Sequence, residues 1–181
     1  MIVFFGPAGA GKSTQGRLLA KKLGWQWISA GDLLRETKNP EILKSIANGE
    51  LVPYEKVNDL VGKAINKATD YANIIIDGFT RNIEEAKFLI DSYPIHKRPI
   101  DIVFVLDVAK DELLRRLKIR GRIDDTPIVI NNRLEKYDKE IDSMLDYYRQ
   151  HNIKIVHIDG QGSIEEVHDR ITGELVKCNL L

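Results

Sequence analysis

Short apolar runs alternate along the chain with longer segments in which apolar residues recur at helical spacing. The runs lie at residues 2–5, 25–29, 74–77, 102–106 and 153–158. Their length and their β-branched or aromatic content predict buried strands. Strands that alternate with helices form parallel sheets covered by helices on both faces. The pattern therefore predicts an α/β fold of three layers around a central, parallel, five-stranded sheet.

The helical segments are bounded by identifiable breaks and caps. We expect helices over residues 12–23, 82–92, 110–120 and 127–150, and a mostly helical stretch over 32–70 that is broken at Asn39-Pro40, Asn48-Gly49 and Pro53. Pro127 suits the first position of a helix. Ser163, with Glu166 three residues later, predicts a capping box at the start of a last helix.

Composition excludes several classes of protein. The 181 residues include 27 Lys and Arg and 27 Asp and Glu, so no net charge favours nucleic acid or membrane as a partner. The single cysteine, Cys178, rules out an intrachain disulfide and a multi-cysteine zinc site. No apolar run is long enough to span a bilayer, and the first leads into a loop rather than a cleavage site. We expect one cytoplasmic domain.

That first loop carries the strongest chemical signal. Residues 6–14, Gly-Pro-Ala-Gly-Ala-Gly-Lys-Ser-Thr, fit the pattern G-x-x-x-x-G-K-[ST]. The glycines let backbone N–H groups turn inward around phosphate oxygens, and the helix that follows directs the positive end of its dipole at the same anion. Lys12 adds a charge for the β- and γ-phosphates, and the Ser13 hydroxyl can ligate Mg²⁺. The loop is interpreted as a nucleoside triphosphate site rather than an accidental glycine-rich turn.

A second signal is Asp77, which ends a buried strand. An acidic residue at a strand end holds Mg²⁺ in phosphate-loop proteins, directly or through water, although an aspartate can also simply cap the next turn. Gly78 and Phe79 follow, in place of a water-activating carboxylate. This arrangement favours phosphoryl transfer to a bound acceptor over hydrolysis.

Arginines form the third signal, because a set of them lies near breaks and helix ends: Arg35, Arg81, Arg116, Arg120, Arg122 and Arg133. Planar guanidinium groups suit the neutralisation of a transferring phosphoryl group. Any one of them could instead form a surface ion pair, and Arg116 and Arg120 could extend from a helix into solvent. The interpretation depends on the set as a whole.

Taken in order, these motifs resemble those of nucleoside monophosphate kinases of the adenylate kinase type, over nearly the full chain. The matching segments are Gly6 to Gln15, Ser-Ala-Gly-Asp-Leu-Leu-Arg at 29–35, Gly-Glu-Leu-Val at 49–52, Asp-Gly-Phe-Thr-Arg at 77–81, and Arg-Gly-Arg-Ile-Asp-Asp at 120–125 followed by Arg133. The resemblance implies a helical flap for the acceptor over residues 30–59 and a short lid over 120–126. The short lid leaves no room for zinc, and most relatives are monomers.

The resemblance also implies a role for each matching position. The donor site for ATP would be formed by Gly9, Ala10, Gly11, Lys12, Ser13, Thr14, Arg116 and the loop from Gly160 to Gly162. The acceptor site would be formed by Ala30, Arg35, Leu51, Val52, Gly78, Arg81 and Glu85, with Arg35 and Arg81 on the α-phosphate. Arg120, Arg122 and Arg133 would close over the transferring group, Asp77 and Ser13 would hold Mg²⁺, and Asp124 and Asp125 would hold the lid arginines or contact the donor ribose.

Three departures from the family pattern concern the acceptor. Ala30 replaces a threonine, and Thr80 replaces a proline that commonly follows a cis bond, so we expect a trans bond between Phe79 and Thr80. Glu85 replaces a glutamine that reads adenine; a carboxylate only accepts hydrogen bonds, which suits guanine or cytosine better than adenine on this count. The alternative is that Glu85 turns into solvent and Asn82 or backbone groups read the base.

The sequence therefore favours an AMP kinase that uses ATP and Mg²⁺, with a CMP/UMP kinase or a GMP kinase of the same fold as alternatives. A different class is a nucleotide-binding regulatory protein that has lost turnover. The intact arginine set argues against that class, because a pure binding protein has no use for groups that stabilise a transition state.

Overall fold

The computed structural model describes the whole chain except residues 49, 51, 69–72, 80, 92–98 and 123–124. Four residues singled out by their sequence context, Gly49, Leu51, Thr80 and Asp124, lie outside the described part. The expected trans bond between Phe79 and Thr80 also lies outside it.

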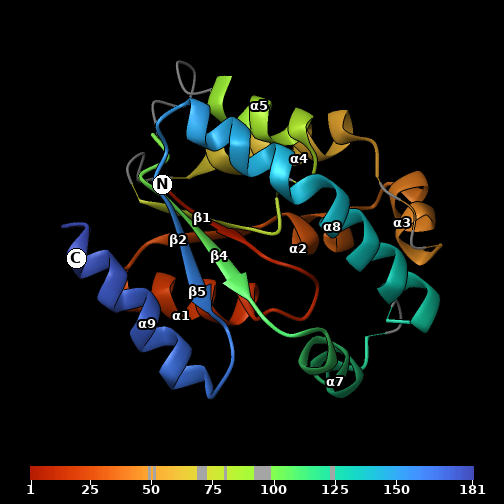
Figure 1. Ribbon diagram of the computed structural model, residues 1–181. Helices are drawn as coiled ribbons and strands as arrows, with labels where there is room; N and C mark the ends of the chain where they lie inside the picture. Colours follow the sequence, from red (N-terminus) through yellow and green to blue (C-terminus); the bar gives the residue numbers. More distant parts are fainter. Residues whose placement is uncertain (49, 51, 69–72, 80, 92–98, 123–124) are drawn as a thin grey trace.

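A parallel sheet forms the centre of the molecule (Figure 1). Its five strands are β1 (Ile2–Phe5), β2 (Gln26–Ser29), β3 (Ile74–Asp77), β4 (Ile102–Asp107) and β5 (Ile155–Asp159). The strand order is β2-β3-β1-β4-β5, and every neighbouring pair is parallel. The predicted α/β fold with a five-stranded parallel sheet is confirmed.

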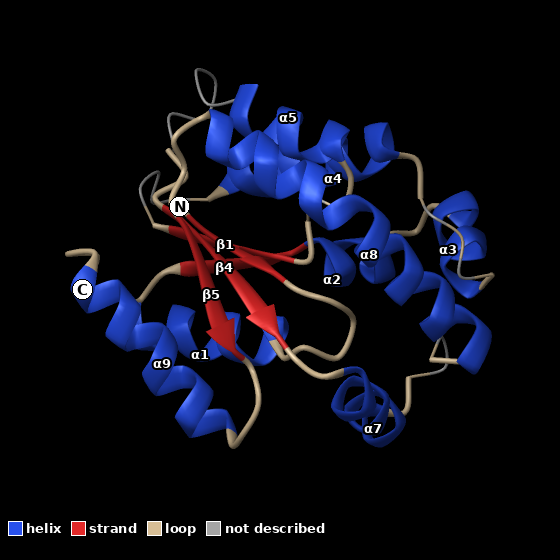
Figure 2. Cartoon of the chain, viewed as in Figure 1, coloured by secondary structure: helices blue, strands red, loops and turns tan. Residues whose placement is uncertain are grey.

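Helices cover both faces of this sheet (Figure 2). Helices α1 (Lys12–Leu23) and α9 (Ile164–Lys177) pack together on one face, while α4 (Tyr54–Lys67), α5 (Ile83–Asp91) and α8 (Pro127–Gln150) cover the other. The short helices α2 (Ala30–Glu36) and α3 (Pro40–Ala47) precede α4, and α7 (Lys110–Arg120) follows β4. None of the helices described in the structure is long and apolar enough to cross a bilayer.

Alternate residues of each central strand feed two separate cores. In β1, Val3 and Phe5 join the core under α4, α5 and α8, whereas Ile2 and Phe4 join the core under α1 and α9. Side chains in a strand point to opposite faces in turn, so a strand buried on both faces must be apolar throughout. This requirement explains the uninterrupted apolar runs in the sequence.

The predicted element ends agree with the structure where a local cap sets them. The Ser163 hydroxyl accepts from Glu166 N–H at 3.1 Å and the Glu166 carboxylate accepts from Ser163 N–H at 2.7 Å, which completes the predicted capping box. Strands β2 and β5 begin later than expected. The N–H groups of Trp25 and Ile153 are each bonded to the end of the preceding helix, so neither residue is free to join the sheet.

Parallel strands place their carboxyl ends at one edge of the sheet, and this edge builds the site. Ser29 and Phe4 are both register partners of Asp77, which therefore lies between the ends of β2 and β1. The connection from β1 leads to β2 at one edge of the sheet, whereas those from β3 and β4 lead toward the other edge, so the phosphate loop lies where the direction of the connections reverses. Ligands of open α/β sheets bind at that point.

Candidate active site

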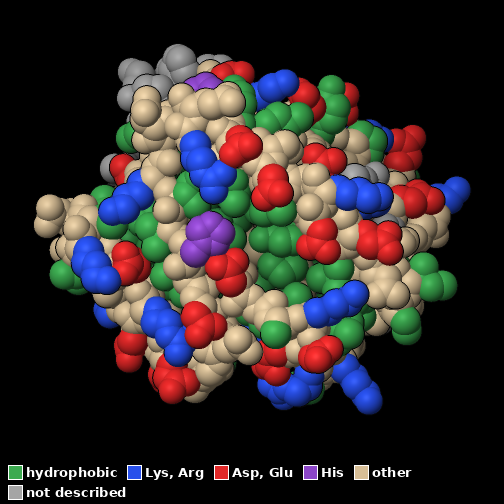
Figure 3. All heavy atoms as spheres, viewed as in Figure 1, with side chains coloured by type: hydrophobic (Ala, Val, Ile, Leu, Met, Phe, Trp, Pro, Cys, Tyr) green, Lys and Arg blue, Asp and Glu red, His purple; other side chains and the backbone are tan. Residues whose placement is uncertain are grey.

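A cleft of about 760 Å³ opens at the carboxyl edge of the sheet. Of the described residues predicted to bind the donor or the acceptor or to act in transfer, all except Ala30 line this cleft. Charged side chains of both signs are interspersed over the face of the molecule shown in Figure 3, whereas arginine and lysine dominate the charge within the cleft. A cationic cleft of this size suits phosphorylated small molecules.

The phosphate loop has the backbone conformation that its glycines allow. Gly6, Gly9 and Gly11 have φ angles of 140°, 89° and 98°. A Cβ atom at Gly6 would lie 3.0 Å from the carbonyl oxygen of Leu106, and one at Gly9 would lie 3.0 Å from that of Leu113. Side chains at these two positions would be both strained and crowded, which explains why the loop needs glycine there.

Lys12 lies at the bottom of this loop. Its ammonium group donates to the carbonyl oxygens of Gly6 at 2.7 Å and Pro7 at 2.8 Å. The side chain retains some solvent contact but is surrounded by protein atoms, and this desolvation lowers the pKa of Lys12 to about 8. Asp77 opposes the shift, while Arg81 and Arg120 add to it. A bound polyanion would restore the charge of the ammonium group.

Asp77 and Ser13 form a polar pair next to Lys12. The Ser13 hydroxyl donates to Oδ2 of Asp77 at 2.6 Å, and the Asp77 residue is only 1% exposed. Its second oxygen, Oδ1, is buried and has no hydrogen-bond partner among the described residues. An unsatisfied buried carboxylate oxygen beside a hydroxyl is a donor set that suits a hard cation such as Mg²⁺. The residues present therefore fit the predicted metal.

Arg116 lies on the donor side of the cleft. It donates to the carbonyl oxygen of Gly160 at 2.9 Å and to the Glu112 carboxylate at 2.7 Å. Hydrogen bonds from Arg115 and Arg116 lower the pKa of Glu112 to about 2, so the carboxylate remains charged and holds the guanidinium in place. The alternative in which Arg116 extends into solvent is wrong, because it bridges α7 and the loop after β5.

On the acceptor side, Arg35 lies against the first turn of α2. Its guanidinium is paired with Asp32, and a Cβ atom at Gly31 would lie 3.2 Å from it. The Ser29 hydroxyl caps the helix by accepting from Asp32 N–H. The Ser-Ala-Gly-Asp segment therefore fixes the start of α2 and leaves room for the arginine that follows one turn later.

Glu85 is buried within the acceptor side and is 3% exposed. Its carboxylate accepts from Arg81 N–H at 2.7 Å and lies 3.4 Å from the amide nitrogen of Asn82. Glu85 N–H in turn donates to the Asn82 side chain at 2.9 Å, so the two side chains cap the start of α5. The alternative in which Glu85 turns into solvent is wrong, because this cap holds it at the cleft wall.

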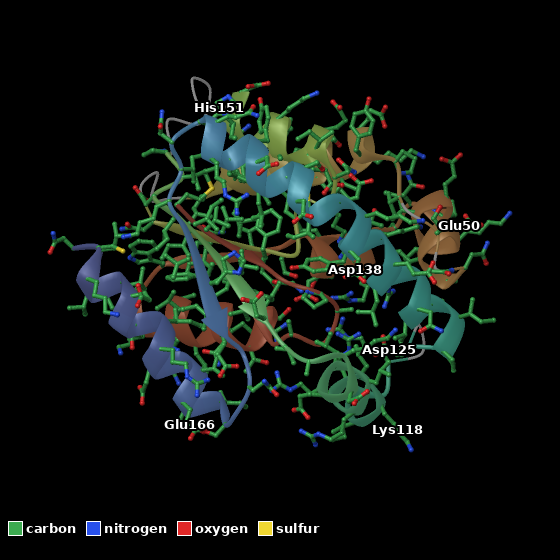
Figure 4. The ribbon with its side chains drawn as sticks, in the orientation of Figure 1. Glu50, Lys118, Asp125, Asp138, His151 and Glu166 are labelled. Atoms are coloured by element: carbon green, nitrogen blue, oxygen red, sulfur yellow. The ribbon has the colours of Figure 1, made fainter. Side chains whose placement is uncertain are left out.

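The short lid segment is organised by Asp125. Its carboxylate accepts two hydrogen bonds from Arg120, at 2.8 and 2.6 Å, and one from Arg133 at 3.2 Å. The side chain of Asp125 is 2% exposed. Figure 4 shows it between α7 and the start of α8. Asp125 thus holds two lid arginines from different helices, and Arg122 also lines the cleft.

One predicted acceptor residue is placed elsewhere. Ala30 is 1% exposed and belongs to the core under α4, because it is the first residue of α2 and points back into the molecule. It is not among the described residues that line the cleft, and its contact with the acceptor stays a prediction.

A further cationic residue of the cleft does not stand out in the sequence. Arg17 lines the cleft from the middle of α1, away from any break or helix end. It is four residues after Ser13, a spacing that places both side chains on one helix face, and that spacing could have found it.

Fold and site together define a phosphate-loop protein of the kinase class, with a cationic cleft that extends from the glycine-rich loop to Arg35 and Arg81. A family model described as adenylate kinase matches residues 4–153. The chain is 39% identical to the adenylate kinase of Mycolicibacterium smegmatis (96% of this chain, 98% of that protein) and 40% identical to that of Mycolicibacterium paratuberculosis (93% and 95%). It belongs to the adenylate kinase family, whose members are ATP-dependent nucleoside monophosphate kinases.

Proposed function

We propose that the protein transfers the γ-phosphoryl group of ATP to AMP and yields two molecules of ADP. The observation that carries the proposal is one cleft in which Lys12 and the phosphate loop face Arg35 and Arg81. A nucleotide hydrolase needs one phosphate site, whereas a transferase needs a second one for its acceptor. The curated relatives, which are named adenylate kinases, support AMP as that acceptor.

On the donor side, the loop amides and Lys12 would bind the β- and γ-phosphates, and Arg116 would lie against the adenine. Ser13 and Asp77 would hold Mg²⁺, which would neutralise negative charge on the phosphates of the donor. The attacking group is an oxygen of the acceptor α-phosphate, which is already anionic. The protein therefore needs no general base. Its role is to position the two substrates and to neutralise the charge on the transferring phosphoryl group.

On the acceptor side, Arg35 and Arg81 would bind the α-phosphate, and Val52, Gly78 and Glu85 would line the base site. Residues 30–59 would act as a flap and 120–126 as a lid that brings Arg120, Arg122 and Arg133 onto the transferring group. Water competes with the acceptor, so both must close before transfer. All these groups belong to one chain, which supports a monomer as the active unit.

A coupled assay of ATP with AMP, CMP, UMP, GMP and dTMP tests the proposal. We expect the highest kcat/KM with AMP. A preference for CMP or GMP would instead assign the chain to another acceptor within the same fold. Absence of transfer to every acceptor, together with tight ATP binding by calorimetry, would support a regulatory nucleotide-binding protein. Lys12→Met and Arg81→Ala are the matched inactive controls, and circular dichroism checks that both variants fold.

A further inference from the structure

Arg17 belongs to a set of contacts that leads from the phosphate-loop helix to the acceptor side. Its guanidinium carbon lies 4.3 Å above the centre of the Trp27 ring on β2. One of its nitrogens donates to Oδ2 of Asp32 at 2.9 Å, while the other oxygen of that carboxylate is paired with Arg35. The Asp32 carboxylate, in the first turn of α2, is therefore held between two arginines.

The position of Trp27 depends in turn on α1. A Cβ atom at Gly16 would lie 2.8 Å from the indole nitrogen of Trp27, so the ring occupies space that only glycine leaves free. That nitrogen is buried and has no hydrogen-bond partner among the described residues. Packing, rather than a hydrogen bond, holds the ring there. Its exposed face provides a fixed platform for the flat Arg17 guanidinium.

The charges explain what Arg17 adds. If Asp32 paired with Arg35 alone, its negative charge would cancel the positive charge of that arginine. Arg35 would then attract a phosphate less strongly. With Arg17 also on Asp32, two positive groups share one negative group, and a net positive charge remains for the acceptor. Burial raises the pKa of Asp32, but the hydrogen bonds and charges of Arg35 and Arg17 outweigh burial and lower it, so the carboxylate remains ionised.

We propose that Arg17, stacked on Trp27, is a positioning residue that holds Asp32 and thereby presents Arg35 to the acceptor phosphate. The proposal rests on the proposed role of Arg35 in binding that phosphate. Arg17 itself lies on the rim and is 58% exposed at its side chain, so its removal leaves the fold intact. The expected effect falls on the acceptor KM, because Arg17 acts through the acceptor arginine rather than through the transferring group.

The test compares Arg17→Ala with Lys21→Ala, which removes an exposed cation from the same helix. We expect Arg17→Ala to raise the KM for AMP about five-fold, with the KM for ATP and kcat within two-fold, as befits a partly exposed ion-pair network. Lys21→Ala should match the wild type. Arg17→Lys keeps the positive charge but loses the flat group that stacks on Trp27. It should therefore reverse less than half of the increase in the KM for AMP.

Trp27 provides the decisive comparison. Trp27→Leu should raise the KM for AMP as Arg17→Ala does, and the double variant should be no worse than either one, because both act through one contact. A thermal melt checks the fold of the Trp27 variants. Equal changes in both KM values, or additive effects in the double variant, would overturn the proposal in favour of general charge attraction.

Arg35→Ala separates the proposal from the function beneath it. If this variant leaves the KM for AMP unchanged, the acceptor role of Arg35 is wrong. If Arg35→Ala raises that KM by ten-fold or more while Arg17→Ala does not change it, only the role of Arg17 is wrong.

Discussion

The Ser13 hydroxyl donates a 2.6 Å hydrogen bond to Oδ2 of Asp77, which is 64 positions away in the chain. The sheet brings them together, because Phe4 at the end of β1 is the register partner of Asp77 at the end of β3. The bond satisfies only one oxygen of a buried carboxylate and leaves Oδ1 without a partner among the described residues. Such a group costs stability unless a cation compensates for it, which ties this pair to the metal of the donor site.

Asp77→Asn tests this relationship. The amide can keep the bond to Ser13 but cannot balance a divalent cation, so we expect kcat to fall about 100-fold and the Mg²⁺ concentration for half-maximal rate to rise. The melting temperature without nucleotide should stay the same or rise, because a buried carboxylate with one unsatisfied oxygen becomes a neutral amide. Asp107→Asn, at the exposed end of β4, is the matched control and should change none of these three quantities.

The lowered pKa of Lys12 predicts how ATP binding depends on pH. Above pH of about 8 the ammonium group of the empty protein loses its proton, and the phosphates of bound ATP restore it. Binding should therefore take up a proton, and the Kd for ATP should rise up to about ten-fold per pH unit above 8. Calorimetry in buffers of different ionisation enthalpy measures the uptake directly.

The same shift affects stability with the opposite sign. The pKa of Lys12 is lower in the folded protein than its ordinary value of 10.5, so the unfolded chain binds more protons between about 8 and 10.5. The contribution of Lys12 to stability without nucleotide therefore rises with pH in that window. Lys12→Arg remains charged at every pH used and should show a flat pH dependence of ATP binding from 8 to 9.5. A flat pH dependence of ATP binding in the wild-type protein would contradict the lowered pKa of Lys12.

The sequence predicted best what neighbouring residues decide. The phosphate loop, the capping box at Ser163 and the start of α8 at Pro127 each depend on a few adjacent residues, and each is present in the structure. The burial of Ala30 in the core could not be predicted from the sequence, because it depends on how α2 packs after β2. Arg17 was missed because its role depends on Trp27 and Asp32, which belong to other elements and reach it only through the fold.

The lid predicts an effect of Asp125→Asn on catalysis. The Asp125 carboxylate accepts hydrogen bonds from Arg120 and Arg133. The substitution removes the negative charge that these two arginines share. We expect kcat to fall about ten- to 100-fold with little change in either KM, because the proposed role of these arginines is to act on the transferring group. Stability should fall by about 1–2 kcal/mol, since the carboxylate is buried but both arginines reach solvent.

Stopped-flow kinetics of one turnover, with a denaturant melt of the same samples, separates the two effects of Asp125→Asn. The matched control is Asp146→Asn, which removes an exposed carboxylate paired with Arg149 on the same long helix and should change neither rate nor stability by much. If Asp125→Asn lowers stability while the single-turnover rate stays at the wild-type value, then the carboxylate holds the lid loop but does not align the arginines for transfer.

The substitution Glu85→Gln should change the preference for the acceptor. The glutamine oxygen can keep the 2.7 Å bond from Arg81 N–H, and the amide nitrogen that replaces the other oxygen supplies a donor for the ring nitrogen of adenine. We expect the ratio of kcat/KM for AMP to that for CMP to rise about ten-fold, which corresponds to about 1.4 kcal/mol. Stability should fall by about 1 kcal/mol, because a charge-assisted cap becomes a neutral one.

The neighbouring Glu84 offers the matched control. Its side chain is 43% exposed and pairs with Lys87, so Glu84→Gln should leave both the acceptor ratio and the melting temperature unchanged. The two variants remove the same charge one residue apart on α5. A difference between them therefore separates a direct contact of Glu85 with the base from the general electrostatic effect of losing one negative charge. An unchanged acceptor ratio in Glu85→Gln would mean that Asn82 or backbone groups read the base, and that Glu85 serves only to cap the helix.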